Sequence, residues 1–555
     1  MNIKVFELIQ RKYEKEIMSA YLENECGQKT EIHPFIYQPI ELIYDEEGIE
    51  HTKITSLPYN MIRFSVNAEG SYTLYISFAD KSEESEEFSA KGVSNNGYVK
   101  VSEGDKRYFE YTNGEPCFVM GINLAFPRRL PVTNNTEFGL SDNVAFMGMR
   151  QYERWLKKCS ENGINMARVW IGHEYFSPDT EDAKTLDYAQ FSKLDILLDL
   201  ARKYNIRLKL TFEQFRWFDF DETDNSNISR HFNKLLYLNG ERCKTALHWI
   251  KEEKWKNAWL EKINEYAKRY AYDTSVFAFE LWNEINCIGL GEGVEFSDIV
   301  EWNKEMIPKI KEMFHNHLVL NSLGSLDCDE ALEAYKEFPW DLCKVKQMHR
   351  YLDQGAKYKD TTKNPIELIK SGMDRICDEK MPFILAETGG CNNCHSGEFK
   401  YYSVDDMGLL FVDCVYTPVF LQSASCGNIW HWDERYVESK NLYKYFRPLA
   451  DMLCGIDFCK ENFNSIDLSD DNAYLLLMQG KSYTLGFVRN KSASWQNLLR
   501  DMQSATPCSD LCIDAPAGTL TEYPIWNEDT TEITMQNNSL MLKNVLYGTI
   551  FKIKH

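Results

Sequence analysis

Short apolar segments alternate with amphipathic helical segments from about residue 98 to residue 450 of this chain. Within residues 191–201, for example, apolar side chains recur at three- and four-residue spacing, and an apolar segment follows at 206–212. This order is typical of repeated βα units, in which helices cover parallel strands. Eight strand candidates occur in series, at residues 118–123, 163–170, 206–212, 276–285, 317–322, 346–351, 383–387 and 427–432. The pattern predicts an α/β fold, a (β/α)8 TIM barrel over about residues 105–450.

The regions on either side of the predicted barrel have a different pattern. In residues 1–100, and again in 451–555, short runs alternate apolar and polar side chains and are separated by turn residues. A period of two predicts strands with one buried face, so we expect a β-sandwich at the N-terminus and another at the C-terminus. The charged stretch 81–89 predicts a loop or linker.

The composition of the chain limits the kinds of partner that it can bind. The net charge of −22 disfavours binding to nucleic acid and to anionic membrane surfaces. No run of about 18 apolar residues predicts a membrane span, and the charged start of the sequence lacks an apolar signal region, so we expect a cytoplasmic protein. The 16 cysteines are scattered, which favours reduced thiols over a disulfide framework. The sequence leaves open whether the chain forms a homo-oligomer.

Two of the predicted strands end in a carboxylate. Glu284 follows the apolar run 276–282, and Glu387 follows the apolar run 382–386. A charge at the end of a buried strand is costly unless it has a function, and barrel active sites lie at the C-terminal ends of the strands. Cleavage of a glycosidic bond needs two such groups, one protonated and one ionised. Glu284 and Glu387 are therefore the candidate catalytic residues.

Further polar and aromatic side chains come near the ends of predicted strands. Hydrogen bonds from an Arg and a Tyr would keep a nucleophilic carboxylate ionised. Glu280 lies inside its strand, and we interpret it as a paired structural charge in the barrel interior. Predicted loops carry four residues that could contact a sugar. The candidate binding residues at strand ends are Arg168, Asn283, His349, Tyr351, Trp430 and Trp432, with Trp430 preferred as the sugar platform, and those on predicted loops are Trp170, His173, Glu213 and Trp217.

A Cys-x-x-Cys-His cluster, Cys391 to His395, follows Glu387 closely. Its spacing matches that of haem attachment, and it offers three zinc ligands in Cys391, Cys394 and His395. The simpler interpretation is a loop beside the active site, rich in turn-forming Asn and Gly, and we adopt it. We therefore predict no metal and no cofactor.

Together, these residues resemble the retaining glycoside hydrolases of clan A, most closely family 5 with its endo-β-mannanase-like and cellulase-like relatives. The resemblance covers about residues 105–450, and its most specific parts are Trp282-Asn283-Glu284 and Glu387. It differs at Ile285, where the family commonly has Pro, and in the loop 391–395. The resemblance implies these roles: acid/base for Glu284, nucleophile for Glu387, binding of the sugar 2-hydroxyl for Asn283, orientation of Glu387 for Arg168 and Tyr351, a place in the site wall for His349, and stacking under the sugar for Trp430 or Trp432.

The expected function is therefore that of a retaining β-glycosidase, a hydrolase acting on carbohydrate substrates that are β-mannosides or β-glucosides. Long aromatic loops at 125–146 and 212–238 predict a walled pocket and exo-action on short oligosaccharides or small glycosides. Three alternatives stay open: a catalytically inactive carbohydrate-binding barrel, a transglycosylase with the same two glutamates, and a metal-dependent hydrolase that uses Cys391, Cys394 and His395.

Overall fold

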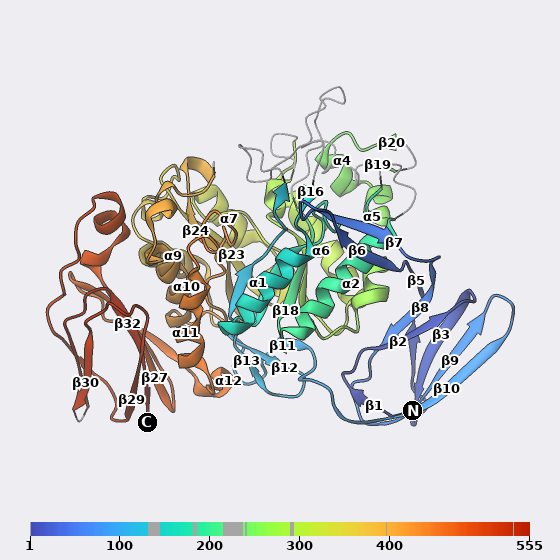
Figure 1. The fold of residues 1–555 in the computed structure, drawn as a ribbon, viewed down its shortest axis with the longest axis horizontal. Coiled ribbons are helices and arrows are strands. Elements are labelled where there is room, and N and C mark those ends of the chain that lie inside the picture. The colour runs from blue at the N-terminus through green and yellow to red at the C-terminus, as the bar shows by residue number, and fades with distance from the viewer. Residues whose placement is uncertain are drawn as a thin grey trace.

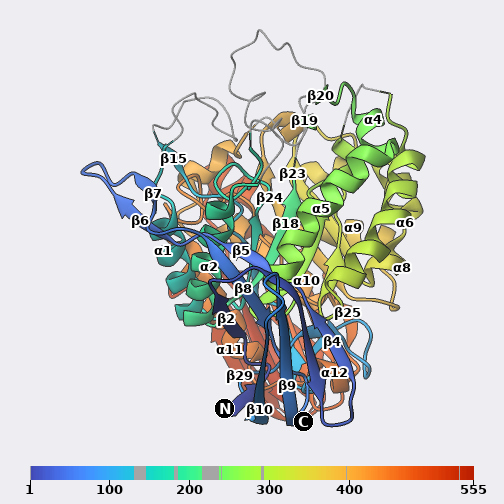
Figure 2. The ribbon, with the colours of Figure 1, turned by 90° about the vertical axis from the view of Figure 1, so that its right-hand side faces the viewer.

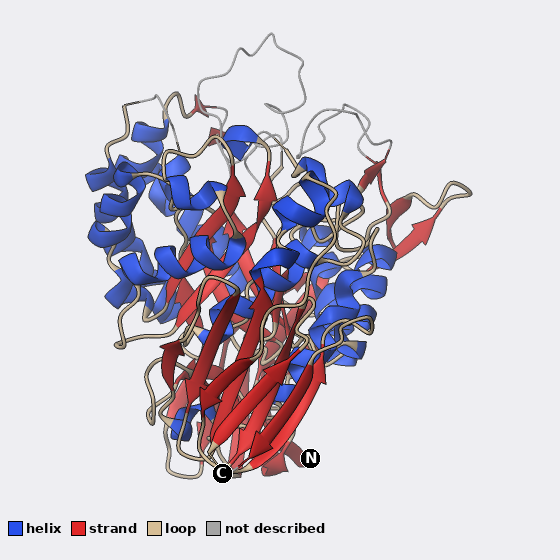
Figure 3. Ribbon diagram, turned by 90° about the vertical axis from the view of Figure 1, so that its left-hand side faces the viewer, coloured by secondary structure: helices blue, strands red, loops and turns tan. Residues whose placement is uncertain are grey.

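The computed structural model describes residues 2–130, 145–180, 186–214, 237–238, 241–288, 293–395, 397–536 and 538–555. Figure 1 shows a central α/β part flanked by β-sheets from the two ends of the chain, with the N-terminus under one flank and the C-terminus under the other, and in Figures 2 and 3 both termini lie at the bottom of the molecule.

The N-terminal region is built from mostly antiparallel strands around a core of its own, and β1 and β10 pair in parallel. Five strands pair in the order β1-β10-β9-β3-β4, three pair as β2-β8-β5, and β6 and β7 form a hairpin. Residues such as Ile62, Leu74 and Ile76 fill the space beside them. The strands are β1 (Asn2–Val5), β2 (Ile9–Tyr13), β3 (Ile17–Asn24), β4 (Lys29–Ile32), β5 (Phe35–Tyr37), β6 (Ile40–Tyr44), β7 (Glu50–Ile54), β8 (Tyr59–Phe64), β9 (Gly70–Phe78) and β10 (Glu83–Val93).

The charged stretch at 81–89 is mostly strand, and the prediction of a loop or linker there was wrong. Residues from Glu83 onward belong to β10, which pairs with β9 along its length. Phe88 and Ala90 are buried, whereas Glu83, Glu84 and Glu87 before them are exposed. Only the end of the charged stretch has a buried face, so the charges concealed the strand.

Parallel strands form the centre of the molecule. A hairpin sheet of β11 (Val99–Val101), β12 (Phe109–Tyr111) and β13 (Pro116–Cys117) precedes them. Five strands then pair in parallel in the order β14-β17-β18-β21-β22, and β23 pairs in parallel with β24. Their bounds are β14 (Gly121–Asn123), β17 (Met166–Trp170), β18 (Arg207–Glu213), β21 (Val276–Trp282), β22 (Leu318–Leu320), β23 (Lys346–Asp353) and β24 (Phe383–Cys391). The α/β class is as predicted.

The predicted eighth strand, 427–432, is not a regular strand. Only two isolated parallel bridges lie in this region, Thr388 with Ile429 on one side and Val119 with Ser425 on the other. Gly427 explains the tight path, because a Cβ there would lie 2.2 Å from the carbonyl oxygen of Cys414. The segment that follows β22 is bonded to β23 by the Leu326 N–H, which donates to the His349 carbonyl at 3.0 Å, and by Gln347, whose Nε2 donates to the Asn321 carbonyl at 2.8 Å.

Helices cover the parallel strands, as Figure 1 shows. Their amphipathic sequences bury one face, as in α1, where Trp155 and Leu156 are buried. Caps stop them from fraying: Asp187 accepts from the Ala189 N–H at the start of α2. The helices are α1 (Met149–Glu161), α2 (Tyr188–Lys203), α4 (Ala246–Lys251), α5 (Glu253–Tyr270), α6 (Phe296–Met313), α7 (Asp329–Glu337), α8 (Trp340–Cys343), α9 (Pro365–Ile376), α10 (Leu409–Phe420), α11 (Phe446–Leu453) and α12 (Phe458–Glu461). Among the helices of the described ranges, none has the length and apolar character that a membrane crossing requires.

The C-terminal sheets share a core with the centre. Along β26, Leu476 and Met478 join the large central core, whereas Leu475 and Leu477 join a smaller core between the two C-terminal sheets. The sheets pair in the orders β25-β26-β27-β32-β29 and β28-β31-β30. Their strands are β25 (Asn464–Asp467), β26 (Ala473–Gln479), β27 (Tyr483–Asn490), β28 (Leu511–Asp514), β29 (Thr519–Pro524), β30 (Glu532–Gln536), β31 (Ser539–Lys543) and β32 (Gly548–Lys554). The division into three domains at 1–100, 105–450 and 451–555 stays a prediction.

A buried ion pair attaches the N-terminal sheet to the centre. Arg63 of β8 donates to both carboxylate oxygens of Asp195 on α2, at 2.7 and 2.8 Å, and both side chains are nearly buried. Arg11 of β2 and Glu86 of β10 form a similar two-bond pair between the two N-terminal sheets, but they are 23% and 36% exposed.

Asp195→Ala should lower the free energy of unfolding by about 3–5 kcal/mol, because it leaves the guanidinium of Arg63 buried without its partner. Glu86→Ala should cost less than about 1 kcal/mol, because water screens that pair. Calorimetric melting of the two variants beside the wild type measures the difference. Equal losses of melting temperature would show that the buried pair does not attach the sheet.

Candidate active site

Glu387 lies within β24 and is held by donors on two other strands. The Tyr351 hydroxyl donates to Oε2 at 2.6 Å, and the Arg168 guanidinium donates to Oε1. The side chain is only 5% exposed. An arginine and a hydroxyl are thus bonded to its two oxygens, which fixes the orientation of the carboxylate as a nucleophile requires.

Arg168 is itself positioned by three further residues. Its Nε donates to Glu280 at 2.6 Å, its Nη2 to the Asn283 side-chain oxygen at 2.6 Å, and its Nη1 contacts Asn123 at 3.4 Å. Burial acts to lower the pKa of Arg168, but attraction by Glu280 and Glu387 outweighs it and leaves the pKa raised. Arg168 is therefore a permanent positive charge between two carboxylates, and the interpretation of Glu280 as a paired interior charge is confirmed.

Glu284 sits just past the end of β21 in a left-handed backbone conformation, with φ 55° and ψ 56°. A non-glycine residue in this region is uncommon and costs free energy, so it occurs where the surroundings require it. The Glu284 N–H donates to the Ser322 hydroxyl at 3.1 Å, and the side chain is 14% exposed. The turn directs Glu284 toward β23, where the ring of His349 lies.

His349 lies between the two glutamates. Its Nδ1 is 2.8 Å from Oε1 of Glu284 and 3.5 Å from Oε2 of Glu387. Burial lowers the pKa of His349 to about 4, so the ring is neutral at neutral pH. One oxygen of each glutamate and a ring nitrogen of His349 all lie within 4.8 Å of one another. The two carboxyl groups predicted from separate strands thus meet at one point.

The two glutamates open into a pocket with a volume of about 760 Å³. Trp170 and Trp430 also line it, with ring centroids 5.2 Å apart, together with Asn283 and Tyr351. Trp432 is fully buried, does not line this pocket and packs against Trp430 with centroids 5.0 Å apart. Of the two eighth-segment tryptophans, Trp430 is the one that reaches the pocket.

The residues predicted on early loops are placed differently. Trp170 and Glu213 are the last residues of β17 and β18, so their placement on loops was wrong. Glu213 is buried, does not line the pocket, and accepts from Lys262 at 2.5 Å and Trp259 at 3.1 Å. His173 is buried against Phe126. Trp217 and most of the loops 125–146 and 212–238 lie outside the described residues.

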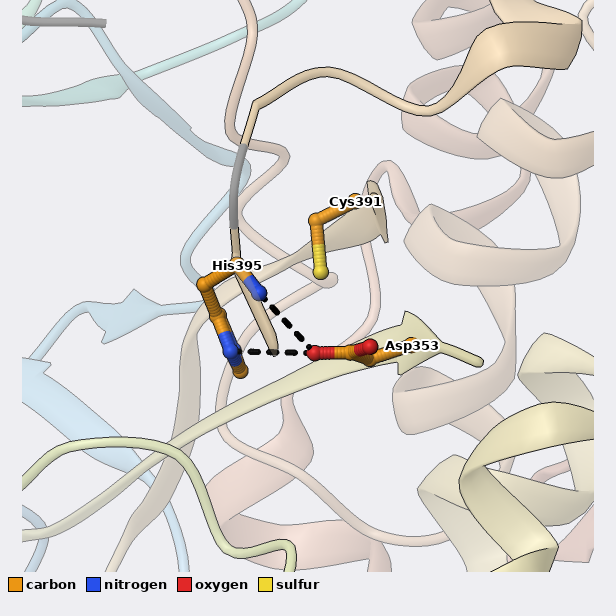
Figure 4. Close-up of side chains that lie close together, drawn as sticks. All are labelled: Asp353, Cys391 and His395. Carbon is orange, nitrogen blue, oxygen red and sulfur yellow. Dashed lines mark hydrogen bonds and ion pairs between the residues drawn. The ribbon is translucent and has the colours of Figure 1, made fainter. Parts of the chain in front are cut away.

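The cluster after Glu387 does not gather the three residues weighed above as zinc ligands (Figure 4). Cys391 and His395 lie beside Asp353 at the end of β23, with one ligand-type atom of each within 4.8 Å of the others, whereas the Cys394 side chain lies outside the described part. These three groups, and Glu284 with His349 and Glu387, are sets that could hold a metal. In the first set both ring nitrogens of His395 are engaged, Nδ1 with Asp353 at 3.0 Å and Nε2 with Ser325 at 2.8 Å. These bonds attach the loop to two strand ends.

The sequence analysis missed Asn123 and Asp353. Asn123 ends β14 and pairs in register with Arg168, so a polar residue at the end of the first predicted strand was the available signal. Asp353 lies two residues beyond Tyr351 on β23, past the predicted end of that strand. The fifteen cysteines whose side chains are described are all free thiols.

Comparison with known proteins gives a consistent result. The profile of the family "Cellulase (glycosyl hydrolase family 5)" matches residues 132–407. Mannan endo-1,4-β-mannosidase A of Emericella nidulans is 26% identical over 236 residues, which cover 42% of this chain and 53% of that protein. The enzyme of the same name from Hypocrea jecorina is 24% identical over 172 residues, covering 29% and 36%. The chain thus spans about half the length, or less, of these curated relatives.

One solved structure shares the fold throughout. A candidate glycoside hydrolase from Bacteroides vulgatus ATCC 8482 aligns over 100% of both chains with a TM-score of 0.58 at 12% identity. The class that the matches define is that of the glycoside hydrolases. Within this class, the chain is similar to the glycoside hydrolases of family 5 over residues 132–407.

The depressed pKa of His349 predicts a pH dependence of stability. The folded pKa, about 4, lies below the ordinary value of 6.5, so the unfolded chain binds more protons between these values. Stability from this group is complete above pH 6.5 and decreases as the pH falls toward 4, by up to ~3 kcal/mol.

Urea unfolding of the wild type and of His349→Gln at pH 7 and pH 4.5 measures this contribution. The gap in stability between the two proteins should narrow at the lower pH. His33→Gln, a change at a half-exposed position, is the control. Its difference in stability from the wild type should be the same at pH 7 and pH 4.5. A gap of His349→Gln that does not change with pH would contradict a neutral buried imidazole.

Proposed function

We propose that the protein is a retaining β-glycosidase that hydrolyses β-mannosides or β-glucosides. The observation that carries the proposal is the pair Glu284 and Glu387, which lie with oxygens within 4.8 Å of each other and have different surroundings. Retaining enzymes need carboxyl groups about 5–5.5 Å apart, whereas inverting enzymes need about 6.5–9.5 Å to admit a water. The shorter separation supports retention.

In the first step, a carboxylate oxygen of Glu387 attacks the anomeric carbon while the bond to the leaving oxygen breaks. Glu284 gives its proton to that oxygen, and the leaving group departs as an alcohol. In the second step, Glu284 takes a proton from water, and the water oxygen displaces Glu387 from the sugar. Arg168 and Tyr351 stabilise Glu387 as it leaves with its negative charge.

The remaining residues are proposed to bind the sugar. The Asn283 side-chain oxygen accepts from Arg168, so its amide nitrogen is left to donate to the 2-hydroxyl. Trp430, with Trp170 beside it, supplies the aromatic surface under the ring. Trp432 supports Trp430 from behind, and Glu213 orders the strand ends rather than contacting substrate.

The mannoside alternative is favoured by the names of the two curated relatives, both mannan endo-1,4-β-mannosidases. We further propose that the parallel strands close into a complete (β/α)8 barrel, with β-sandwich domains at 1–100 and 451–555. The two bridges through Ile429 and Ser425 and the bond from Leu326 to His349 support the closure. A cytoplasmic location stays a prediction.

A carbohydrate-binding barrel without activity is the main alternative. It would not require a buried arginine and a tyrosine bonded to the two oxygens of one carboxylate, nor a strained backbone that directs a second carboxyl group at the first. A transglycosylase would use the same groups and differ only in the acceptor of the second step.

The two glutamates should respond differently to replacement. Glu387→Ala removes the nucleophile, so turnover of every glycoside should fall by several orders of magnitude. Glu284→Ala removes the proton donor, so poor leaving groups should suffer far more than dinitrophenyl glycosides, and azide should restore turnover as the glycosyl azide. Glu398→Ala, at an exposed position nearby, is the control and should retain full activity. Equal losses on both substrate types in Glu284→Ala would refute its role as the acid.

The size of the pocket supports exo-action on short substrates. A volume of about 760 Å³ is that of a small-molecule site and not of a cleft for a polymer. We expect monosaccharide as the first product from mannotetraose or cellotetraose, with little activity on soluble mannan or carboxymethyl cellulose. Chromatography of early time points measures this, and a first mixture of di- and trisaccharides would indicate endo-action instead.

A further inference from the structure

The pocket extends past the glutamates into a groove between α6 and α7. Its walls are made by Val294, Phe296 and Ile299 at the start of α6 and by Ala331 and Ala334 of α7, and these five residues define the α6–α7 groove. Ile299 and Ala334 are buried, and the other three are half-buried. These five side chains are hydrocarbon and offer no hydrogen bond to a sugar hydroxyl, although carboxylates of α7 lie beside them.

The groove lies on the side of Glu284. Asn286 and Cys287 directly follow Glu284 and line the same pocket. The Gly324 N–H donates to the Asn286 side-chain oxygen at 2.7 Å, so the turn that carries Glu284 is bonded to the segment after β22. That segment continues through Cys328 into α7. The connection from the acid to the groove is therefore short and made of described contacts.

Glu387 lines the same pocket, and the two tryptophans lie beside it. The Trp430 N–H donates to the Thr388 carbonyl at 2.8 Å, and Thr388 directly follows Glu387. Trp430 and Trp170 thus lie beside the nucleophile, where the sugar ring is held. The leaving group must lie beside the acid that protonates it, because proton and leaving oxygen meet in the transition state.

We propose that the α6–α7 groove is a binding site for an apolar leaving group, so that the substrates are β-glycosides with an alkyl or aryl aglycone. The inference rests on the proposed function, because that function makes Glu284 the acid and so puts the leaving group beside it. Its physical basis is the removal of apolar surface from water on both partners. A pocket of this kind differs from a site that binds sugar units on both sides of the scissile bond.

The charge of the pocket wall also selects among aglycones. Asp327, Glu330, Glu333 and Glu337 line the pocket at the α7 side, and no Lys or Arg is among the described residues that line it. Lys357 at 2.9 Å from Glu330 and Lys336 at 2.8 Å from Glu333 neutralise part of this charge. An aglycone that carries a carboxylate is therefore disfavoured beside α7.

The test uses methyl, butyl and octyl β-thioglycosides of glucose and mannose, which resist hydrolysis, with the intact protein. Isothermal titration below the micellar concentration gives the affinity as a function of chain length. A fully buried methylene improves affinity by about fourfold and a half-exposed one by about twofold, so we expect roughly twofold per methylene. An octyl chain that ends in a carboxylate should bind more weakly than the plain octyl chain.

Variants locate the effect. Val294→Ser and Phe296→Ser should each flatten the dependence of affinity on chain length, because they replace wall hydrocarbon by a hydroxyl. Val404→Ser makes the same change at an apolar residue that is 47% exposed and does not line the pocket, and the dependence should persist there. Melting curves of each variant verify that it is folded. The dependence in the wild type itself provides a measurement that needs no variant.

The outcomes separate this inference from the proposed function. A wild type that hydrolyses O-glycosides but binds all chain lengths equally would overturn the groove assignment and leave the glycosidase assignment intact. Length-dependent binding without any hydrolysis would overturn the glycosidase and leave the groove. A dependence that persists in both wall variants would also refute the groove, since the chain would then bind elsewhere.

Discussion

The buried guanidinium of Arg168 is the interaction on which the active site depends. It connects Glu280 in the interior, Glu387 at the pocket and Asn283 beside the acid, and all of these side chains are at most 5% exposed. A lone charge at this depth would be unfavourable by several kcal/mol, so each member requires the others. Burial raises the cost of charging Glu280, but Arg168 and Lys209 more than compensate, and the pKa of Glu280 is lowered. The nucleophile is thus held by a network that extends through the strands.

The two glutamates differ because their surroundings differ. Glu387 is nearly buried, with an arginine and a tyrosine as donors, whereas Glu284 reaches the pocket from a strained turn and contacts a neutral imidazole. Glu387 is thus bonded to a permanently charged guanidinium, whereas Glu284 is bonded to a neutral ring. Such a division between two carboxyl groups is the arrangement that acid and nucleophile roles need. The same turn also joins Glu284 to the wall of the α6–α7 groove, so the position of the acid and the proposed aglycone site share one support.

Much of the fold could be predicted because its signals are local. Seven of the eight predicted parallel strands occur close to their expected bounds, since a buried strand needs a continuous apolar run wherever it lies. The prediction was wrong where local signals conflict with distant contacts. The charges of β10 concealed a buried face, and the segment at 427–432 lost its regular strand form because Gly427 packs against the backbone of α10. Placement of Trp170 and Glu213 on loops was wrong by the one or two residues that separate a strand end from a loop.

The sequence by itself determined which residue types end the strands. The residues Arg168, Glu284, His349, Tyr351 and Glu387 all follow or close apolar runs, and this pattern can be read directly from the sequence. Only the tertiary structure decided which of them meet. Glu213 and Glu387 have similar local sequence settings, yet one is paired with Lys262 behind the site and the other faces Glu284. His395 turned out to contact Asp353 and Ser325, which are 42 and 70 residues away in sequence. The reason is that the side-chain direction at a strand end depends on strand register and twist, and these are set by contacts between segments far apart in the chain.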